Sequence, residues 1–208
     1  MITYCILGFT VIFSLIGFRD RAFFAKYMFN PWRVHNNKNE WYTVFTHAFL
    51  HADYVHLFFN MFTLYIFGLA LEQELLPAFF PKYANYFYLM LYFGGIVVSS
   101  VPAYEKHKNN PSYSAIGASG AIYAVLFSYI VINPTAMLQI MFVPIPLPAF
   151  VLGILYLLYE WYMSKRGKTN IGHDAHLWGG LFGIVFTCMI HFEFIPRFYH
   201  QLVALFTS

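Results

Sequence analysis

Apolar residues fill six long segments of the chain, and polar residues collect between these segments or at their ends. The segments cover residues 2–18, 54–72, 83–103, 118–133, 145–163 and 175–192. A helix that crosses a bilayer needs roughly 17–25 predominantly apolar residues, and each segment except the shorter fourth one meets this length. The pattern therefore predicts an all-α membrane protein, a bundle of six transmembrane helices in a single domain, residues 1–208.

A connector, residues 19–53, separates the first two segments and mixes polar with aromatic side chains. It contains Trp32 and Trp41 among many Phe and Tyr residues. Aromatic side chains of this kind gather where lipid meets water. We expect a structured segment that lies at the membrane interface. The first apolar segment lacks a basic start and a small-residue cleavage site, so we expect a membrane helix there, not a cleaved signal peptide.

The composition also indicates a membrane protein. Hydrophobic residues make up 60% of the chain and charged residues only 10%. A soluble domain carries roughly 25% charged residues, so this chain has too few to cover a surface in water. The net charge of +3 is small and gives no indication of a nucleic-acid partner. Cys5 and Cys188 both fall in apolar segments, where we expect packing roles and no disulfide framework.

Helices that alternate in direction bring the starts of the second, fourth and sixth segments to one side of the membrane. These starts read HADYVHLFFN (51–60), GASG (117–120) and GHDAHLWGG (172–180). Polar groups at membrane depth are costly and by default mark a functional site. We therefore expect the polar side chains of these three motifs to meet, although the first and last motifs are more than 100 residues apart.

The residue types in the three motifs suit acyl transfer. Ser119 and His176 would form a nucleophile and its general base. His56 and Asn60 are four residues apart and share a helix face, from which they could donate hydrogen bonds to an oxyanion. Backbone N–H groups at the start of the fourth helix would assist them, and Gly117 leaves room for the backbone to approach a ligand.

Small residues recur at a spacing of four on both helices of the expected pair. Gly120 and Ala124 lie on the serine helix, and Gly179 and Gly183 lie on the histidine helix. Small residues at this spacing let two membrane helices approach closely, which a direct contact between serine and histidine requires.

An acidic residue and a tyrosine flank the expected pair. Asp174 is two residues from His176, so on a helix the two side chains diverge, and we expect a helix-start acid rather than a triad member. Tyr123, one turn after Ser119, could stack on the imidazole and hold it in place of an aspartate. The sequence therefore predicts a Ser-His dyad.

The three motifs, in this order on alternate helices, resemble the rhomboid family of intramembrane serine proteases. The resemblance runs from about Trp41 to the end of the sixth segment. It implies a nucleophile at Ser119 in GxSG and a general base at His176 in AHxxG, without a cofactor or metal. It also implies that substrates are membrane-spanning segments cleaved near an exposed end. The remaining roles that it implies are an oxyanion site (His56, Asn60), packing on the base (Tyr123), and structural or water-holding histidines (His47, His51).

The chain departs from the family pattern in its connector and in its charge distribution. The family usually carries an arginine shortly after the connector tryptophan, whereas Trp41 is followed by Tyr42, Thr43 and Val44. Ten Lys and Arg residues lie on the expected active-site side, and only Lys82 and Arg197 lie on the other. The positive-inside rule would place this side in the cytoplasm, while bacterial family members suggest the outer side. We expect the family orientation, in a bacterial cytoplasmic membrane.

Two alternatives remain open from the residues. A non-catalytic relative would bind membrane segments without cutting them, but such proteins typically lack the serine or the histidine. A metal-dependent membrane enzyme would draw imidazole ligands from His47, His51, His173 and His176, which leaves Ser119 in its glycine setting unexplained. The substrate and the oligomeric state are not indicated by the sequence.

Overall fold

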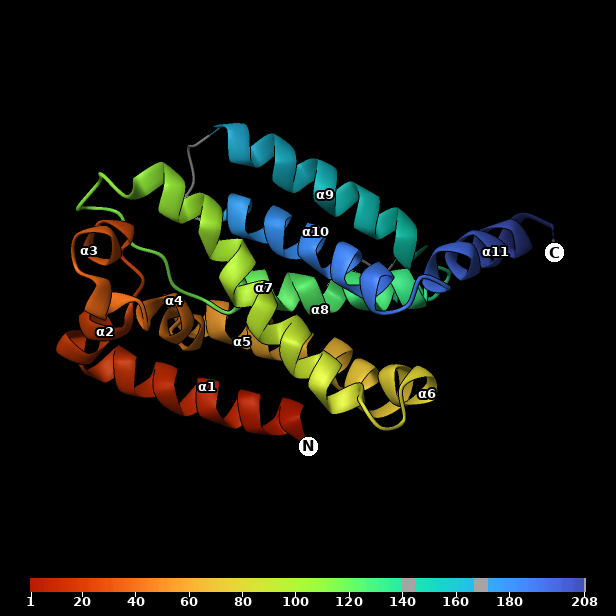
Figure 1. Cartoon of the computed structure of the whole chain (residues 1–208), viewed down its shortest axis with the longest axis horizontal. Helices are drawn as coiled ribbons and strands as arrows, with labels where there is room; N and C mark the ends of the chain where they lie inside the picture. The colour runs from red at the N-terminus through yellow and green to blue at the C-terminus, as the bar shows by residue number, and fades with distance from the viewer. Residues whose placement is uncertain (140–144, 167–171, 208) are drawn as a thin grey trace.

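The structure is a computed structural model that describes residues 1–139, 145–166 and 172–207. Helices make up most of this part of the chain, and long helical segments occupy all six predicted regions (Figure 1). They are α1 (Ile2–Arg19), α5 (Tyr54–Thr63), which continues through the wider turns η3 (Leu64–Gly68) and η4 (Ala70–Leu75) into α6 (Leu76–Phe79), α7 (Ala84–His107), α8 (Ser119–Ile132), α9 (Ala149–Arg166) and α10 (His173–Ile190).

Three of the helices in the described residues are long and apolar enough to cross a membrane. They are α1, the continuous helix Tyr54–Phe79, and α7. The helix α10 passes the same test only together with α11 (Phe194–Thr207), from which it is separated by a bend of 107°. The apolar helix α8 is shorter. The protein is thus a helical membrane protein, and the count of six spans stays a prediction.

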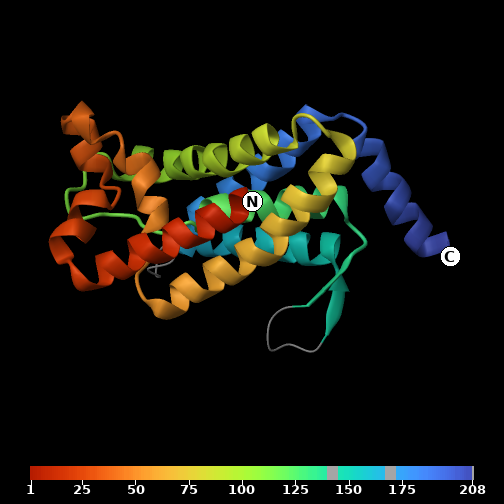
Figure 2. The ribbon, with the colours of Figure 1, turned by 90° about the horizontal axis from the view of Figure 1, so that it is seen from below.

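The helices alternate in direction. In Figure 1, α5, α8 and α10 run from the end that holds α2, α3 and α4 toward the end that holds α6 and α11, and α1, α7 and α9 run the opposite way. The starts of α5 and α10 therefore lie toward the end of the molecule that holds the connector. The segment 108–118 runs inward from the same end and leads to the start of α8 in the middle of the bundle (Figures 1 and 2).

The helix α8 is the central helix of the bundle, with most of its side chains buried. It packs closely against α10 because both present small residues to each other. The helix α8 also packs closely against α7, since a Cβ atom at Gly120 would lie 2.2 Å from Ser99 Oγ. A Cβ atom at Gly183 would lie 2.3 Å from the carbonyl oxygen of Ala124. The backbones of α8 and α10 are therefore close enough for short side chains on these two helices to touch.

The connector folds into short helices instead of an extended loop. These are α2 (Arg21–Tyr27), α3 (Pro31–Asn36), η1 (Lys38–Glu40), α4 (Thr43–Thr46) and η2 (His47–Phe49). Asn30 caps α3 by accepting from the backbone N–H of Arg33, with a proline at the first helical position. Arg33 in turn donates to the carbonyl of Ala25 at 2.7 Å and pairs with Glu40. An arginine from elsewhere in the connector thus supplies hydrogen bonds, and the place of the connector at the membrane interface stays a prediction.

A pair of strands and a helix were not expected from the long apolar segments. Strands β1 (Met137–Gln139) and β2 (Pro146–Pro148) form an antiparallel pair in which Leu138 faces Leu147. The fifth helix begins at Ala149 and not at residue 145 because the prolines of β2 precede it. The helix α11 lies beyond the sixth segment and buries Phe194 at its start.

Candidate active site

The connector holds the segment that leads into α8. Phe29 and Ala115 exchange two backbone hydrogen bonds, and the N–H of Gly117 donates to the carbonyl of His47 at 2.9 Å. Gly117 has φ of +109°, a conformation that side chains with a Cβ rarely adopt. A Cβ atom there would also lie 2.9 Å from Cε1 of His56. Glycine is therefore required at this position for two separate reasons.

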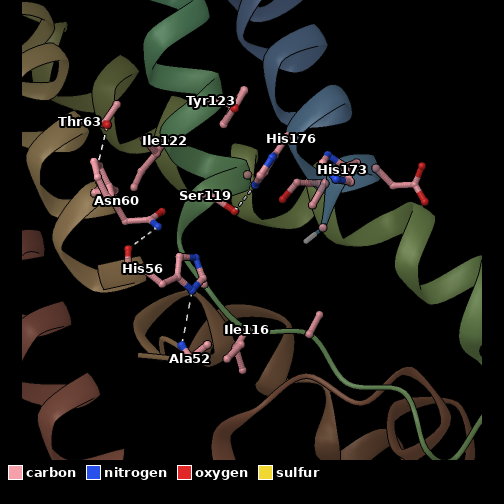
Figure 3. Close-up of a pocket in the computed structure, with 18 of the residues that line it drawn as sticks. Ala52, His56, Asn60, Thr63, Ile116, Ser119, Ile122, Tyr123, His173 and His176 are labelled. Atoms are coloured by element: carbon pink, nitrogen blue, oxygen red, sulfur yellow. Dashed lines mark hydrogen bonds between the residues drawn. The ribbon is translucent and has the colours of Figure 1, made fainter. Parts of the chain in front are cut away.

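Ser119 and His176 touch across the contact between α8 and α10. Ser119 is the first residue of α8, and His176 lies in the first turn of α10. The Oγ of Ser119 and the Nε2 of His176 are 2.8 Å apart, and both residues line one cavity (Figure 3). This is the distance at which a histidine can take the proton of a serine hydroxyl.

Tyr123 lies against the imidazole from the next turn of α8. Its ring is nearly parallel to that of His176, with an interplanar angle of 5° and centroids 4.4 Å apart. The Tyr123 hydroxyl donates to Oε1 of Glu160 at 2.9 Å. Tyr123 therefore stacks on the imidazole of His176 and also forms a hydrogen bond with Glu160.

Glu160 of α9 is a site residue that the sequence reasoning missed. Its buried carboxylate lies 3.0 Å from Nδ1 of His176 and 2.5 Å from Nδ1 of His173. The prediction that Tyr123 holds the imidazole in place of an aspartate is corrected in one respect, because the carboxylate of Glu160 contacts His176 as well as Tyr123. One signal was available: Glu160 is the single charged residue of the apolar segment 145–163.

Asp174 lies apart from this group. Its carboxylate is 3.4 Å from the Nζ of Lys106 on α7, in a partly exposed ion pair. Such a pair contributes at most about 1 kcal/mol to stability. The side chain is thus engaged away from the imidazole, as expected from its spacing to His176.

His56 and Asn60 face the same cavity from α5, opposite Ser119 and His176 (Figure 3). Asp53 caps α5 by accepting from the N–H of His56 at 2.7 Å. Asn60 donates one amide proton to the carbonyl of His56 at 2.8 Å, which leaves its second amide proton available. The first backbone N–H groups of α8, including that of Gly120, have no acceptor within the helix. Donors from two helices therefore border the space in front of Ser119.

His47 and His51 form hydrogen bonds with serines of other helices. The Nε2 of His47 is 3.0 Å from Ser100 Oγ of α7, and the Nδ1 of His51 is 2.9 Å from Ser14 Oγ of α1. Burial lowers the pKa of His47 to about 4 and that of His51 to about 3. Both histidines are therefore neutral near pH 7, and they hold the connector against the bundle.

The cavity in front of Ser119 has a volume of about 1660 Å³ and extends between α5 and α9. Its end near Ser119 and His176 is polar. Farther along α5, α8 and α9 its walls are apolar, with Phe59, Leu126 and Tyr156 among them. The space is long and mostly apolar, with polar groups gathered at one end.

One group of residues in the described part of the chain could hold a metal ion: Glu160, His173 and His176. In the structure the carboxylate contacts both rings directly. His47 and His51 bond to Ser100 and Ser14 and do not belong to this group. The four histidines that the metal-dependent alternative combines are therefore not brought together.

The sequence matches the model of the Rhomboid domain over residues 38–192. The chain belongs to the rhomboid family. This rhomboid protein is similar to "RHOMBOID-like protein 12, mitochondrial" of Arabidopsis thaliana, at 29% identity over 84% of this chain and 54% of the relative. It is also similar to "Putative rhomboid protease YdcA" of Bacillus subtilis (strain 168), at 32% identity over 44% of this chain and 41% of the relative.

A third relative, "Rhomboid-like protein 11, chloroplastic" of Arabidopsis thaliana, is 26% identical over 76% of this chain and 55% of its own length. The rhomboid protein spans about half the length of the curated relatives that it matches. The family membership and the long apolar helices together show that it is an integral membrane protein. The narrower prediction of a bacterial cytoplasmic membrane gains no support, because two of these relatives are named for plant organelles.

Proposed function

We propose that this rhomboid protein is an intramembrane serine endopeptidase that cleaves transmembrane segments through an acyl-enzyme. The observation that carries the proposal is the 2.8 Å contact between Ser119 Oγ and His176 Nε2, at the polar end of a cavity that His56 and Asn60 also line. The family supports the same activity, since rhomboids are generally intramembrane serine proteases.

The reaction has two halves. The Nε2 of His176 takes the proton of Ser119 as Oγ attacks the scissile carbonyl carbon, and the oxyanion accepts hydrogen bonds from Asn60, His56 and the first N–H groups of α8. His176 then gives the proton to the leaving amine, and the acyl-enzyme remains on Ser119. A water molecule deprotonated by His176 attacks the ester carbon, releases the new carboxyl end and restores the serine hydroxyl.

The shape of the cavity supports a membrane-spanning segment as the substrate. Apolar walls between α5 and α9 suit the side chains of such a segment, and the polar end suits a stretch of exposed backbone. A peptide bond inside a helix is shielded by neighbouring turns, so the substrate must unwind near Ser119 before attack. We also propose six spans, in which α8, α9 and α10 cross the bilayer beside α1, the helix Tyr54–Phe79, and α7.

Purified protein in liposomes, given a substrate with one transmembrane segment, tests the proposal. Wild type should cleave it, and Ser119→Ala and His176→Ala should each abolish cleavage while keeping the thermal unfolding of wild type. Ser128→Ala, on the same helix and bonded to Thr187, and His200→Ala, exposed on α11, are matched controls that should remain active. Near wild-type cleavage by either site variant would refute the assignment.

A further inference from the structure

Glu160 places a buried carboxylate behind the imidazole of His176, on the edge opposite Ser119. It belongs to α9, which contributes none of the three sequence motifs. Its side chain is 4% exposed, and its Oε1 faces both the hydroxyl of Tyr123 and Nδ1 of His176, while Oε2 faces Nδ1 of His173. A buried charged group without partners is strongly destabilising, and here every partner is a residue of the candidate site or its neighbour.

The contact with Glu160 decides which ring nitrogen of His176 carries the proton. A carboxylate only accepts hydrogen bonds, so the Nδ1 that faces it carries the proton. The Nε2 is then unprotonated and can accept from the hydroxyl of Ser119, 2.8 Å away. The opposite tautomer would place an N–H toward Ser119 and prevent His176 from acting as a base. A carboxylate at this edge also stabilises the imidazolium that forms during attack.

Tyr123 and His173 hold the carboxylate in this position. Tyr123 stacks on the face of His176 and bonds by its hydroxyl to the same carboxylate oxygen. His173 lies one turn before His176 on α10 and occupies the other oxygen. The imidazole is therefore fixed by its face and by its edge, and the carboxylate is fixed at both oxygens.

We propose that Glu160 is a positioning residue that sets the tautomer of His176, so that the site works as a Ser119–His176–Glu160 array supported by Tyr123 and His173. The inference rests on the proposed protease activity. A purely structural role, tying α9 to α10, would require the same hydrogen bonds but would leave the acid–base behaviour of His176 unchanged.

The variant Glu160→Gln separates these roles because it keeps the side-chain size and removes the charge. In liposome cleavage assays, kcat should fall about 100-fold or more with KM nearly unchanged, as expected when a triad carboxylate loses its charge. Loss of the anion makes protonation of the imidazole less favourable, so the acidic limb of the pH–kcat profile should move to lower pH. Nitrogen NMR of labelled histidine should show a mixed tautomer at His176 in place of the Nδ1–H form.

Glu72→Gln is the matched control, since Glu72 is a buried glutamate that bonds to the backbone N–H groups of Ile2 and Thr3, away from the site. It should lower the unfolding temperature and leave the pH profile in place. Wild-type kcat in Glu160→Gln, or a loss of kcat with an unshifted pH profile, would overturn the inference. So would activity of wild type that EDTA abolishes and zinc restores, because the group would then be a metal site. Failure of the protease proposal itself would show separately, as equal behaviour of wild type and Ser119→Ala.

Discussion

The carbonyl oxygen of Gly120 lies only 2.1 Å from the position that a Cβ atom of Gly179 would take. Here α8 and α10 touch backbone to backbone, one residue past Ser119 and three past His176. The short distance between the serine and the histidine is therefore a consequence of this glycine pair.

Gly179→Ala should separate the two helices and weaken cleavage more than it weakens folding. The added methyl group meets backbone that cannot rotate away, and overpacking of this kind costs about 1–3 kcal/mol. We expect the unfolding temperature to fall by several degrees and cleavage to fall much further, because the Ser119–His176 contact is lost. Gly8→Ala is the control, since nothing lies within 4 Å of its Cβ position. Equal activity of the two variants would contradict this explanation.

Gly117→Ala should displace His56. The residue would have to keep φ at +109° and place its Cβ 2.9 Å from the His56 ring. Strain in this region costs on the order of 1–3 kcal/mol. Cleavage should drop with little change in the overall fold, as measured by circular dichroism and by substrate turnover. Full activity in this variant would show that neither the backbone conformation nor the position of His56 matters for the reaction.

Asn60→Ala should lower kcat without abolishing it. A single oxyanion donor contributes about 3–4 kcal/mol at most, or roughly 10²–10³ in rate. The exposed Asn85 of α7 offers a control, Asn85→Ala, that should be neutral. Asn60→Ala should keep the KM of wild type and nearly its unfolding temperature, because the interaction is made only in the transition state. A large fall in the unfolding temperature together with the loss of kcat would indicate a structural role for Asn60.

Acidification should destabilise the fold through His47 and His51. Both are buried neutral, with pKa values of about 4 and about 3, so the folded protein binds fewer protons than the unfolded chain. Their contribution to the free energy of unfolding is therefore fully present above the unfolded pKa near 6.5. It decreases as the pH falls toward 4, by on the order of 3 kcal/mol for His47.

Thermal unfolding in detergent between pH 7 and pH 4 measures this dependence. His47→Gln keeps a hydrogen-bonding side chain toward Ser100 but does not titrate, so its pH dependence should be shallower than that of wild type. The exposed His200→Gln should follow wild type. Identical slopes for His47→Gln and wild type would show that another group controls acid unfolding.

The apolar segments allowed the helices to be predicted because length and hydropathy depend on consecutive residues. The observed boundaries lie within a few residues of the predicted ones, except that the second helix continues to Phe79. The helix α11 was missed because its apolar residues form one face rather than a run. Strands β1 and β2 were missed because each has only three residues.

The site was predictable where motifs and alternation carried the information. Ser119, His176, His56 and Asn60 line one cavity because their helices start on the same side. Glu160 could not be placed in the same way, since its role depends on the rotation of α9 about its own axis. A single glutamate in an apolar segment indicates a buried partner but does not say which residue that partner is.

The backbone hydrogen bonds of Ala115 and Gly117, in the segment before α8, attach this segment, and with it Ser119, to the connector. The connector is expected at the membrane surface, so its hydrogen bonds would set how deep Ser119 lies below that surface. This depth would be the same for every substrate. Under the proposed activity, the position of cleavage would depend on how far below the surface a substrate helix opens. Different sequences would then be cut at a similar distance from the point where they leave the bilayer.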